Sequence, residues 1–423
     1  MHDRPAAPGI SRRVRVGGPV VLAIAVALYV AAYLRWPSLA SQVDLLVYRF
    51  GATRVWDGQD PYSIGMTGDP DTMLFIYTPF AALCFLPLIG LSQVAVLALG
   101  LVVNVACVGY LVHRMLTAAG LTTSAGLWGL TALLVAPILW LEPVRLSLQL
   151  GQINLVIMAL VVADLLAPAS RRWAGVGIGI AAGIKLTPAL FIVFLFVTGR
   201  RREAVVAGAT FVSTIAAGFL LLPTESKHFW LDGLFRDERR ISSDPLANTS
   251  LVGLLERLGA TEMWGLAAAA VLGVVALALA AWAWRCGHLL LGIAVAGMTS
   301  AAVSPFSWSH HWVWLVPLVV YLGVLGYLYR SRAAALTLWL LAAMFGGWFV
   351  ASRSDPPQAG LMSLRHPGMW DQLLPAAYLF AFVVVLAWSV YALWRARQLT
   401  GAGGGAGGDL EAQPRARPRS SVR

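Results

Sequence analysis

Long apolar segments fill most of this chain, and they constrain its fold more than any other feature of the sequence. Runs of about 18 to 25 mainly apolar residues recur along it, and each is long enough to cross the hydrocarbon core of a bilayer as a helix. Helices that satisfy their own backbone hydrogen bonds are stable in lipid, whereas irregular segments are not. We therefore predict an all-α polytopic membrane protein with roughly ten to twelve transmembrane helices.

Composition and charge agree with this class. Only 12% of the residues are charged, against about 25% in an average soluble domain. The net charge of +11 comes from arginines at the ends of apolar runs, a pattern that indicates topology and not a nucleic-acid partner. The three cysteines, Cys84, Cys107 and Cys286, lie within or beside apolar runs. No spacing typical of a metal or redox site joins them, so we interpret them as packing residues.

The chain is expected to have three parts. Residues 1–18 are polar and basic and are predicted to form a cytoplasmic tail. Residues 19–397 are predicted to form the transmembrane domain. Residues 398–423, which are rich in glycine, arginine and proline, are predicted to form a disordered cytoplasmic tail. A cleaved signal peptide is the alternative for the first span, Pro19 to Trp36. No small-residue cleavage site that supports it precedes Asp44.

Nine further continuous spans are expected at 91–112, 126–141, 147–167, 204–222, 263–285, 288–306, 311–329, 333–351 and 371–394. Two other apolar segments are predicted to be broken: 74–90 contains two prolines, and 173–199 has Gly183-Ile184-Lys185-Leu186-Thr187-Pro188 at its centre. Broken elements of this kind line cavities. A full crossing by 74–90 is the alternative, with eleven or twelve crossings in total, but it would place Arg114 on the outer side.

The loop after the first span carries Gln42-Val43-Asp44-Leu45-Leu46-Val47-Tyr48-Arg49-Phe50-Gly51-Ala52. From Asp44 to Trp56 its apolar residues leave a polar face, which predicts a helix lying along the membrane interface. An ionisable group at a membrane boundary costs free energy unless it is paired or used. Our hypothesis is that Asp44 is the chemical centre of a membrane-embedded enzyme. A helix N-cap or an ion pair with Arg49 is the alternative for Asp44.

Other polar side chains recur at the expected external ends of the spans, where they could line one external cavity: Tyr77, Glu142, Arg145, Gln149, Gln152, Asn154, Lys185, Asn248, Ser250 and Ser307 to His311. An ammonium group within the membrane needs a counter-anion, and a lipid phosphate would serve for Lys185. Snorkelling to an interface or pairing with Glu142 is the alternative for Lys185.

The sequence Ser307-Trp308-Ser309-His310-His311 combines an interfacial aromatic pattern with two histidines that such a pattern does not require. Neighbouring residues on a helix point about 100° apart, so one of the two histidines is expected to face the cavity. A metal site is the alternative, but no His-x-x-x-His or Asp-x-Asp pattern supports it, and we predict none. The chain also has no phosphate-cradling glycine loop after a strand, which argues against soluble nucleotide sugars and ATP as substrates.

The ensemble of motifs resembles the polyprenyl-phosphate-mannose-dependent mannosyltransferases of glycosyltransferase family 87, which have the GT-C membrane fold. The resemblance covers about residues 40–320 and rests on Val43 to Tyr48, Asp57 to Tyr62, Tyr77 to Phe80, Leu150 to Asn154, Gly183 to Pro188, Asn248 to Leu251 and Ser304 to His311. Each motif alone is weak. One departure is Thr78, where the family more often reads Tyr-Pro-Pro.

The resemblance implies a GT-C-like bundle and a mannose donor, a β-linked polyprenyl phosphate, used on the outer face of the plasma membrane. It also implies α-1,2 mannosides on envelope glycolipids such as phosphatidylinositol mannosides, lipomannan and lipoarabinomannan as products. The aspartate of the first-loop motif is held to be essential in relatives, and Asp44 matches it. No cofactor and no nucleic-acid partner are implied.

The function predicted from these observations is an inverting, single-displacement glycosyl transfer. Asp44 is the expected general base. Lys185 and one of His310 and His311 are expected to bind the donor phosphate, with Arg49 and Arg145 behind them and with Gln152, Asn154 and Tyr48 on sugar hydroxyls. The alternatives are a lipid or sugar transporter or flippase of the cell envelope, which also needs broken helices, and a catalytically silent scaffold for envelope assembly.

Overall fold

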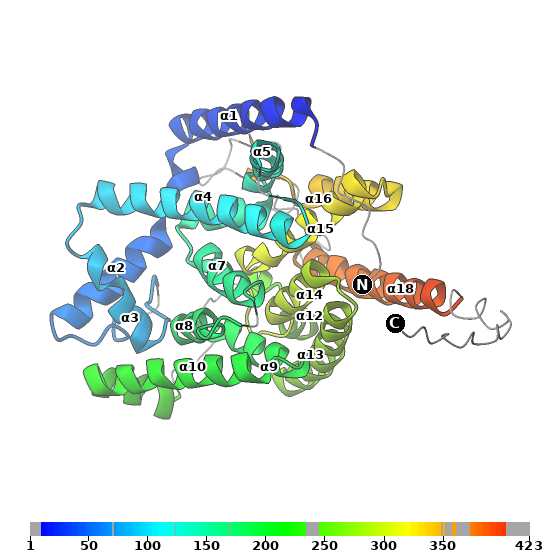
Figure 1. The fold of residues 1–423 in the computed structure, drawn as a ribbon. Coiled ribbons are helices and arrows are strands. Elements are labelled where there is room, and N and C mark those ends of the chain that lie inside the picture. The colour runs from blue at the N-terminus through cyan, green and yellow to red at the C-terminus, as the bar shows by residue number, and fades with distance from the viewer. Residues whose placement is uncertain are drawn as a thin grey trace, which may run out of the picture.

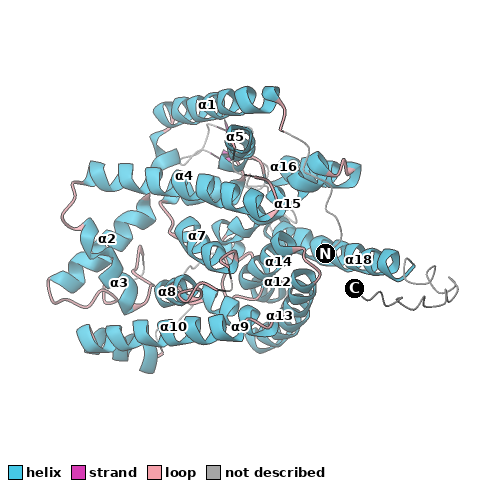
Figure 2. Ribbon diagram, viewed as in Figure 1, coloured by secondary structure: helices cyan, strands magenta, loops and turns pink. Residues whose placement is uncertain are grey.

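The computed structural model describes residues 10–402 except 70–71, 123, 169, 234–244, 348–349, 352–357 and 361–372. The described part is almost entirely helical (Figures 1 and 2). Its strands are a single antiparallel pair, β1 (Val350–Ala351) and β2 (Gln358–Ala359). The predicted all-α class is therefore confirmed.

The first half of the described chain contains α1 (Arg12–Arg35), α2 (Val43–Trp56), α3 (Pro79–Phe85), α4 (Gln93–Ala118), α5 (Ala125–Leu139), α6 (Glu142–Leu150), α7 (Asn154–Leu165), α8 (Val176–Ile184), α9 (Leu190–Val197) and α10 (Arg201–Leu221). The second half contains α11 (Pro223–Ser226), α12 (Leu251–Arg257), α13 (Glu262–Arg285), α14 (Leu289–Ala302), α15 (Leu315–Leu328), α16 (Arg332–Phe345) and α18 (Ala377–Ala402). The short helical turns that matter for the site are η3 (Thr187–Ala189) and η8 (Ser309–Trp314).

Among the described residues, six helices are long and apolar enough to cross a membrane, and a bent pair, α6 with α7, makes a seventh candidate. The six are Arg12–Arg35, Gln93–Ala118, Arg201–Leu221, Glu262–Arg285, Ser309–Leu328 and Leu374–Trp394. The protein is thus a polytopic helical membrane protein. Five shorter apolar helices accompany these spans. The total of ten to twelve crossings stays a prediction.

The ends of the chain differ in detail from the expected division. Helix α1 begins at Arg12, within the range 1–18 that we expected as a tail, and the Ser11 side chain accepts a hydrogen bond from the Val14 N–H at its start. A serine at this position satisfies a backbone donor that the helix cannot. Helix α18 continues to Ala402. The remainder of the expected tail at 398–423 lies outside the described residues.

Both segments predicted to be broken are broken. Residues 74–90 form only the short helix α3 and the turn Leu86–Leu88, and Pro79 stands in the first turn of α3, where its missing N–H costs nothing. Residues 173–199 form two half-helices, α8 and α9, with Lys185 in extended conformation after α8 and the turn η3 before α9. The combination of Gly183, Lys185 and Pro188 at the centre of this segment therefore predicted the break correctly.

A third break was not expected. We predicted one continuous span at 147–167, but α6 and α7 meet at an angle of 119°. Gly151 ends α6 with φ +71°, a left-handed conformation that glycine adopts without steric cost. In an apolar context a single glycine does not reveal a bend, so the continuous helix was the wrong interpretation.

The helices leave the polar residues of the breaks near the middle of the molecule. Helix α8 packs between α7 and α10, and η8 packs against α6 and α7. Helices α2 and α3 lie together beside one end of α4 and α10 (Figure 1). The breaks at Gly151 and Lys185 and the start of α2 are thereby brought together, although they are far apart in the sequence.

Candidate active site

The predicted first-loop helix is confirmed as α2, with Asp44 in its first turn. The N-cap, Gln42, has φ 47° and donates from its backbone N–H to the Gln149 carbonyl at 2.7 Å. Two glycines admit this close approach: a Cβ at Gly100 would lie 2.3 Å from Gln42 Oε1, and one at Gly151 would lie 2.7 Å from Leu45 Cβ. The start of α2 is therefore pressed against α4 and against the bend between α6 and α7.

This contact joins Asp44 to Gln152, the residue after the bend. The Nε2 amide of Gln152 donates a hydrogen bond to Asp44 Oδ2. Asp44 is partly exposed, and this bond occupies only one of its two carboxylate oxygens. Among the described residues Asp44 is neither the N-cap of α2 nor in an ion pair with Arg49.

Two tyrosine hydroxyls meet the other end of the Gln152 amide. Tyr48 donates to Gln152 Oε1 at 2.9 Å, Tyr77 lies 3.3 Å from the same oxygen, and the two hydroxyl oxygens are 2.8 Å apart. Tyr48 is 1% exposed, and its ring stacks on Phe85 with centroids 4.7 Å apart. Tyr77 was expected in the cavity but not among the principal site residues, because nothing in the sequence links it to Gln152.

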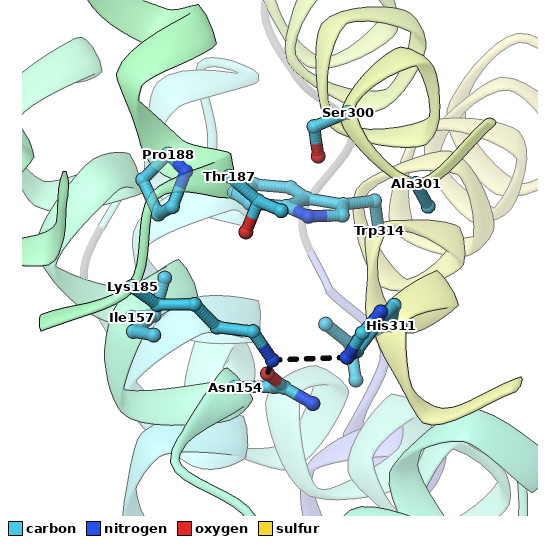
Figure 3. A pocket seen from close by; sticks show the side chains of 10 residues that line it. Asn154, Ile157, Lys185, Thr187, Pro188, Ser300, Ala301, His311 and Trp314 are labelled. Carbon is cyan, nitrogen blue, oxygen red and sulfur yellow. Dashed lines mark hydrogen bonds between the residues drawn. The ribbon is translucent and has the colours of Figure 1, made fainter. Parts of the chain in front are cut away.

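Lys185 lies at the break between α8 and η3 and reaches two partners from other elements (Figure 3). Its Nζ donates to Asn154 Oδ1 at 3.1 Å and lies 2.9 Å from His311 Nε2. Nζ also lies 5.6 Å from the centre of the Tyr77 ring, within the range of a cation–π interaction. Lys185 does not pair with Glu142, which accepts a hydrogen bond from Tyr378 at 2.8 Å.

A small cavity opens beside Lys185. It has a volume of about 20 Å³, enough for one water molecule. In Figure 3 the Lys185 and His311 side chains border one side of it, and Trp314, Thr187 and Ser300 border the other. The cavity therefore has a cationic edge and, opposite it, a wall that combines the Trp314 ring with the Thr187 and Ser300 side chains.

The two histidines have different surroundings. His311 lines the cavity and contacts Lys185, whereas His310 does not line it. His310 is 5% exposed, its ring stacks on Trp308 at 5.9 Å, and its backbone carbonyl accepts from Asn154 at 3.1 Å. Its Nε2 atom has no hydrogen-bond partner among the described residues. Of the pair, His311 is the residue that joins the lysine.

The loop before His311 is held by a motif whose role the sequence did not reveal. Asn248 Oδ1 accepts from the Ser307 N–H at 3.1 Å, and Asn248 Nδ2 donates to the Pro305 carbonyl at 2.9 Å. Trp312 Nε1 donates to Thr249 Oγ1 at 2.9 Å. These bonds fix both sides of the histidine pair, and all the residues concerned except Trp312 belong to motifs noted above for their family resemblance.

The two arginines expected to stand behind the donor phosphate, Arg49 and Arg145, have partners other than Asp44 and Lys185. Arg49 donates to the Ile89 carbonyl at 3.5 Å, on the side of α2 that packs on the turn Leu86–Leu88. Arg145 is buried in α6 and donates to Gln149 Oε1 at 2.7 Å. In the described part of the chain, the hydrogen bonds of Asp44 and Lys185 go to Gln152, Asn154 and His311. The charge that the structure brings near Asp44 is that of Lys185.

Burial and charge act in opposite directions on Asp44. Helix α2 is not one of the candidate spans, and burial raises the pKa of Asp44 to about 6, while the Gln152 hydrogen bond and the charge of Lys185 lower it. A carboxylate with a pKa near working pH is suited to accept a proton. Among the described residues no group of histidine, cysteine and acidic side chains could hold a metal ion.

These features define a class: a polytopic membrane protein in which a partly buried carboxylate and a partly buried amine lie near breaks in its helices. The family model for glycosyltransferase family 87 matches residues 75–305, a range that begins after Asp44. This match and the similarity to curated relatives show that the chain belongs to glycosyltransferase family 87.

Two curated relatives carry the name polyprenol-phosphate-mannose-dependent alpha-(1-2)-phosphatidylinositol mannoside mannosyltransferase. The one from Mycolicibacterium smegmatis is 32% identical, over 82% of this chain and 83% of the relative. The one from Mycobacterium tuberculosis is 32% identical, over 75% of this chain and 78% of the relative. A third relative, from Mycolicibacterium smegmatis, carries the name polyprenol-phosphate-mannose-dependent alpha-(1-2)-phosphatidylinositol pentamannoside mannosyltransferase. It is 32% identical, over 92% of this chain and 94% of the relative. No solved structure matches the chain.

Proposed function

We propose that this chain transfers mannose from polyprenyl-phosphate-mannose to a phosphatidylinositol mannoside or a related lipoglycan, forming an α-1,2 linkage. The names of the relatives supply donor, acceptor and linkage. The observation within the chain that supports the proposal is a partly buried carboxylate, Asp44, near a partly buried amine, Lys185. The charge of Lys185 lowers the Asp44 pKa, although the two groups form no ion pair among the described residues.

The reaction is a single displacement with inversion. Asp44 accepts the proton of the acceptor hydroxyl, the hydroxyl oxygen bonds to the anomeric carbon, and the bond from that carbon to the phosphate oxygen breaks. The electron pair of the broken bond leaves with the phosphate, so a β-linked donor gives an α-linked product. Asp44 Oδ2 is occupied by Gln152, and Oδ1 is the oxygen that accepts the proton.

The leaving polyprenyl phosphate gains negative charge as the bond breaks. Lys185 is the cation placed to stabilise it, with His311 and Asn154 as its neighbours, and fixed charges of this kind act most strongly where water is excluded. Arg49 donates to the Ile89 carbonyl and Arg145 to Gln149, and this step is therefore assigned to Lys185.

The site is proposed to face the outside of the plasma membrane. Asn154 and Gln152 lie at the start of α7. At the other end of α7, about 18 Å away for a helix of this length, Arg200 donates to the Leu165 carbonyl at 2.6 Å and Arg114 to the Leu166 carbonyl at 3.3 Å. Arginine-rich ends of spans remain in the cytoplasm, which leaves the start of α7 for the external side.

The test is transfer of radiolabelled mannose from polyprenyl-phosphate-mannose to a phosphatidylinositol mannoside in membranes containing the protein. Asp44→Asn should lose transfer while keeping expression. Asp57→Asn is the matched control, because Asp57 is an exposed acid just after α2. This variant should remain active. Full activity of Asp44→Asn would contradict the assignment of Asp44 as the general base. Lipid flux without a glycosidic product would favour a transporter.

A further inference from the structure

The chemistry of its partners fixes which way the Gln152 amide faces. An ionised carboxylate can only accept hydrogen bonds, so the amide nitrogen must face Asp44. The amide oxygen then faces Tyr48 and Tyr77, whose hydroxyls can donate. A reversed amide would set its oxygen against the carboxylate and lose the bond to Asp44. The two tyrosines therefore hold Gln152 in the orientation that Asp44 needs.

The same contacts leave Gln152 and Tyr48 little capacity for a sugar. Gln152 is 6% exposed, and both ends of its amide are occupied by protein partners. The Tyr48 hydroxyl donates its one hydrogen to Gln152, and its oxygen lies 2.8 Å from the Tyr77 hydroxyl oxygen. The sequence suggested that Gln152 and Tyr48 bind sugar hydroxyls, whereas their surroundings direct them toward Asp44.

We propose that Gln152, oriented by Tyr48 and Tyr77, is a positioning residue for Asp44. It occupies Oδ2 and so presents Oδ1 to the acceptor hydroxyl in a fixed direction. This inference rests on the proposed function, in which Asp44 is the general base. Gln152 touches no reacting atom and acts only through the carboxylate.

A positioning role has two measurable consequences. Without the Gln152 hydrogen bond the carboxylate can rotate, so a smaller fraction of bound substrate is aligned for proton transfer, and kcat falls while KM does not. The same bond lowers the Asp44 pKa. Its removal therefore moves the acid limb of the pH–rate profile to higher pH, because the carboxylate then ionises only at higher pH.

The experiment compares Gln152→Met with the double variant Tyr48→Phe, Tyr77→Phe in the mannose transfer assay, over a pH series and at several donor and acceptor concentrations. We expect kcat to fall about tenfold in Gln152→Met, with KM unchanged and the acid limb at higher pH. The double variant should change in the same direction, because it removes both donors to the amide oxygen. Phenylalanine keeps the ring contact of Tyr48 with Phe85, so this variant retains the packing of the site.

Gln149→Met is the matched control. Gln149 is also a buried glutamine in the same region, but its side chain binds Arg145 and not Asp44. The acid limb of the pH–rate profile of Gln149→Met should therefore stay in the wild-type position. Wild-type kcat and acid limb in both Gln152→Met and the double variant would overturn the proposal. A raised KM at unchanged kcat would also overturn it, since that result identifies sugar binding.

Asp44→Asn, assayed in parallel, separates the two proposals. If Asp44→Asn is fully active, the proposed function of Asp44 has failed, and with it the inference about Gln152. If Asp44→Asn is inactive while Gln152→Met behaves as the wild type, only the positioning role is overturned.

Discussion

At the scale of single residues, Asp44 combines partial access to solvent with a largely apolar environment. Burial disfavours its ionised form, and Gln152 and the charge of Lys185 restore part of that form. The helix start adds a smaller favourable effect, since Asp44 lies in the first turn of α2, where the backbone N–H groups point toward it. These opposing effects leave a carboxylate that changes protonation near pH 6, and not near 4 as in water.

The pH dependence of transfer follows from this pKa. A raised pKa means that Asp44 is already protonated, and therefore unable to act as a base, over a pH range in which an ordinary aspartate is ionised. We expect kcat/KM to be constant above about pH 7 and to fall about tenfold per unit below pH 6. The measurement is initial mannose transfer in membranes buffered from pH 4.5 to 8.5. A rate that stays constant down to pH 4.5 would contradict the assignment.

At the scale of elements, the site depends on breaks in helices, and each break is stabilised by a particular contact. Thr78 caps α3 by accepting from the Ala81 N–H at 3.1 Å, and its hydroxyl donates to the Gly183 carbonyl near the end of α8. The last carbonyls of a helix have no partner within it, so this bond satisfies one of them beside Lys185. Thr78 is the position at which this chain departs from the family motif, and its hydroxyl makes a contact that proline cannot.

Removing the Thr78 hydroxyl tests the value of this contact. Thr78→Val keeps the shape of the side chain but leaves the Gly183 carbonyl without its donor and α3 without its cap, at a cost of about 1 to 3 kcal/mol. We expect a lower melting temperature in detergent and weaker transfer, with both largely restored in Thr78→Ser. Equal stability of the valine and serine variants would show that the Gly183 bond is not needed.

The bend at Gly151 depends on the absence of a side chain there. In Gly151→Ala the new methyl group would lie 2.7 Å from Leu45 Cβ and 2.9 Å from Gln42 Cβ, in addition to the strain of φ +71°. The start of α2 must then move, and Asp44 moves with it. We expect at least a tenfold loss of transfer, because small displacements of a reacting group are costly.

Gly199→Ala is the control for the Gly151 variant. Gly199 has φ +89° but no atom within 4 Å of the position of a Cβ, so its alanine variant adds backbone strain without a collision. It should lose some thermal stability and keep most of its transfer activity. If the two alanine variants lose activity equally, backbone strain and not displacement of α2 is the cause.

At the scale of the whole molecule, the sequence predicted what local chemistry determines. Apolar length predicted the polytopic helical class, and proline and lysine within apolar runs predicted the breaks at 74–90 and 173–199. The bend at Gly151 escaped prediction because a single glycine in an apolar run does not indicate a bend, and the close approach of α2 to this glycine is a contact between distant parts of the sequence. The contacts of Gln152 with Tyr48 and Tyr77 escaped for the same reason, since they join three separate elements. Six residues of the predicted site lie together: hydrogen bonds join Asp44 to Gln152 and Gln152 to Tyr48, and they join Lys185 to Asn154 and His311. The charge of Lys185 acts on Asp44 and relates the two groups.

The orientation of the molecule in the membrane gives the last prediction. Arg114, Arg200 and Arg285 all donate to carbonyls at the ends of α7 or α9, so these arginines lie at the ends of helices that begin near the site. If this end is cytoplasmic, the loop that follows α2 is external. In a variant whose native cysteines are replaced by alanine, Gln59→Cys should react with a membrane-impermeant maleimide on intact cells. Arg202→Cys, which is equally exposed, should react only after the cells are permeabilised. The opposite result would place the site in the cytoplasm and exclude an external donor.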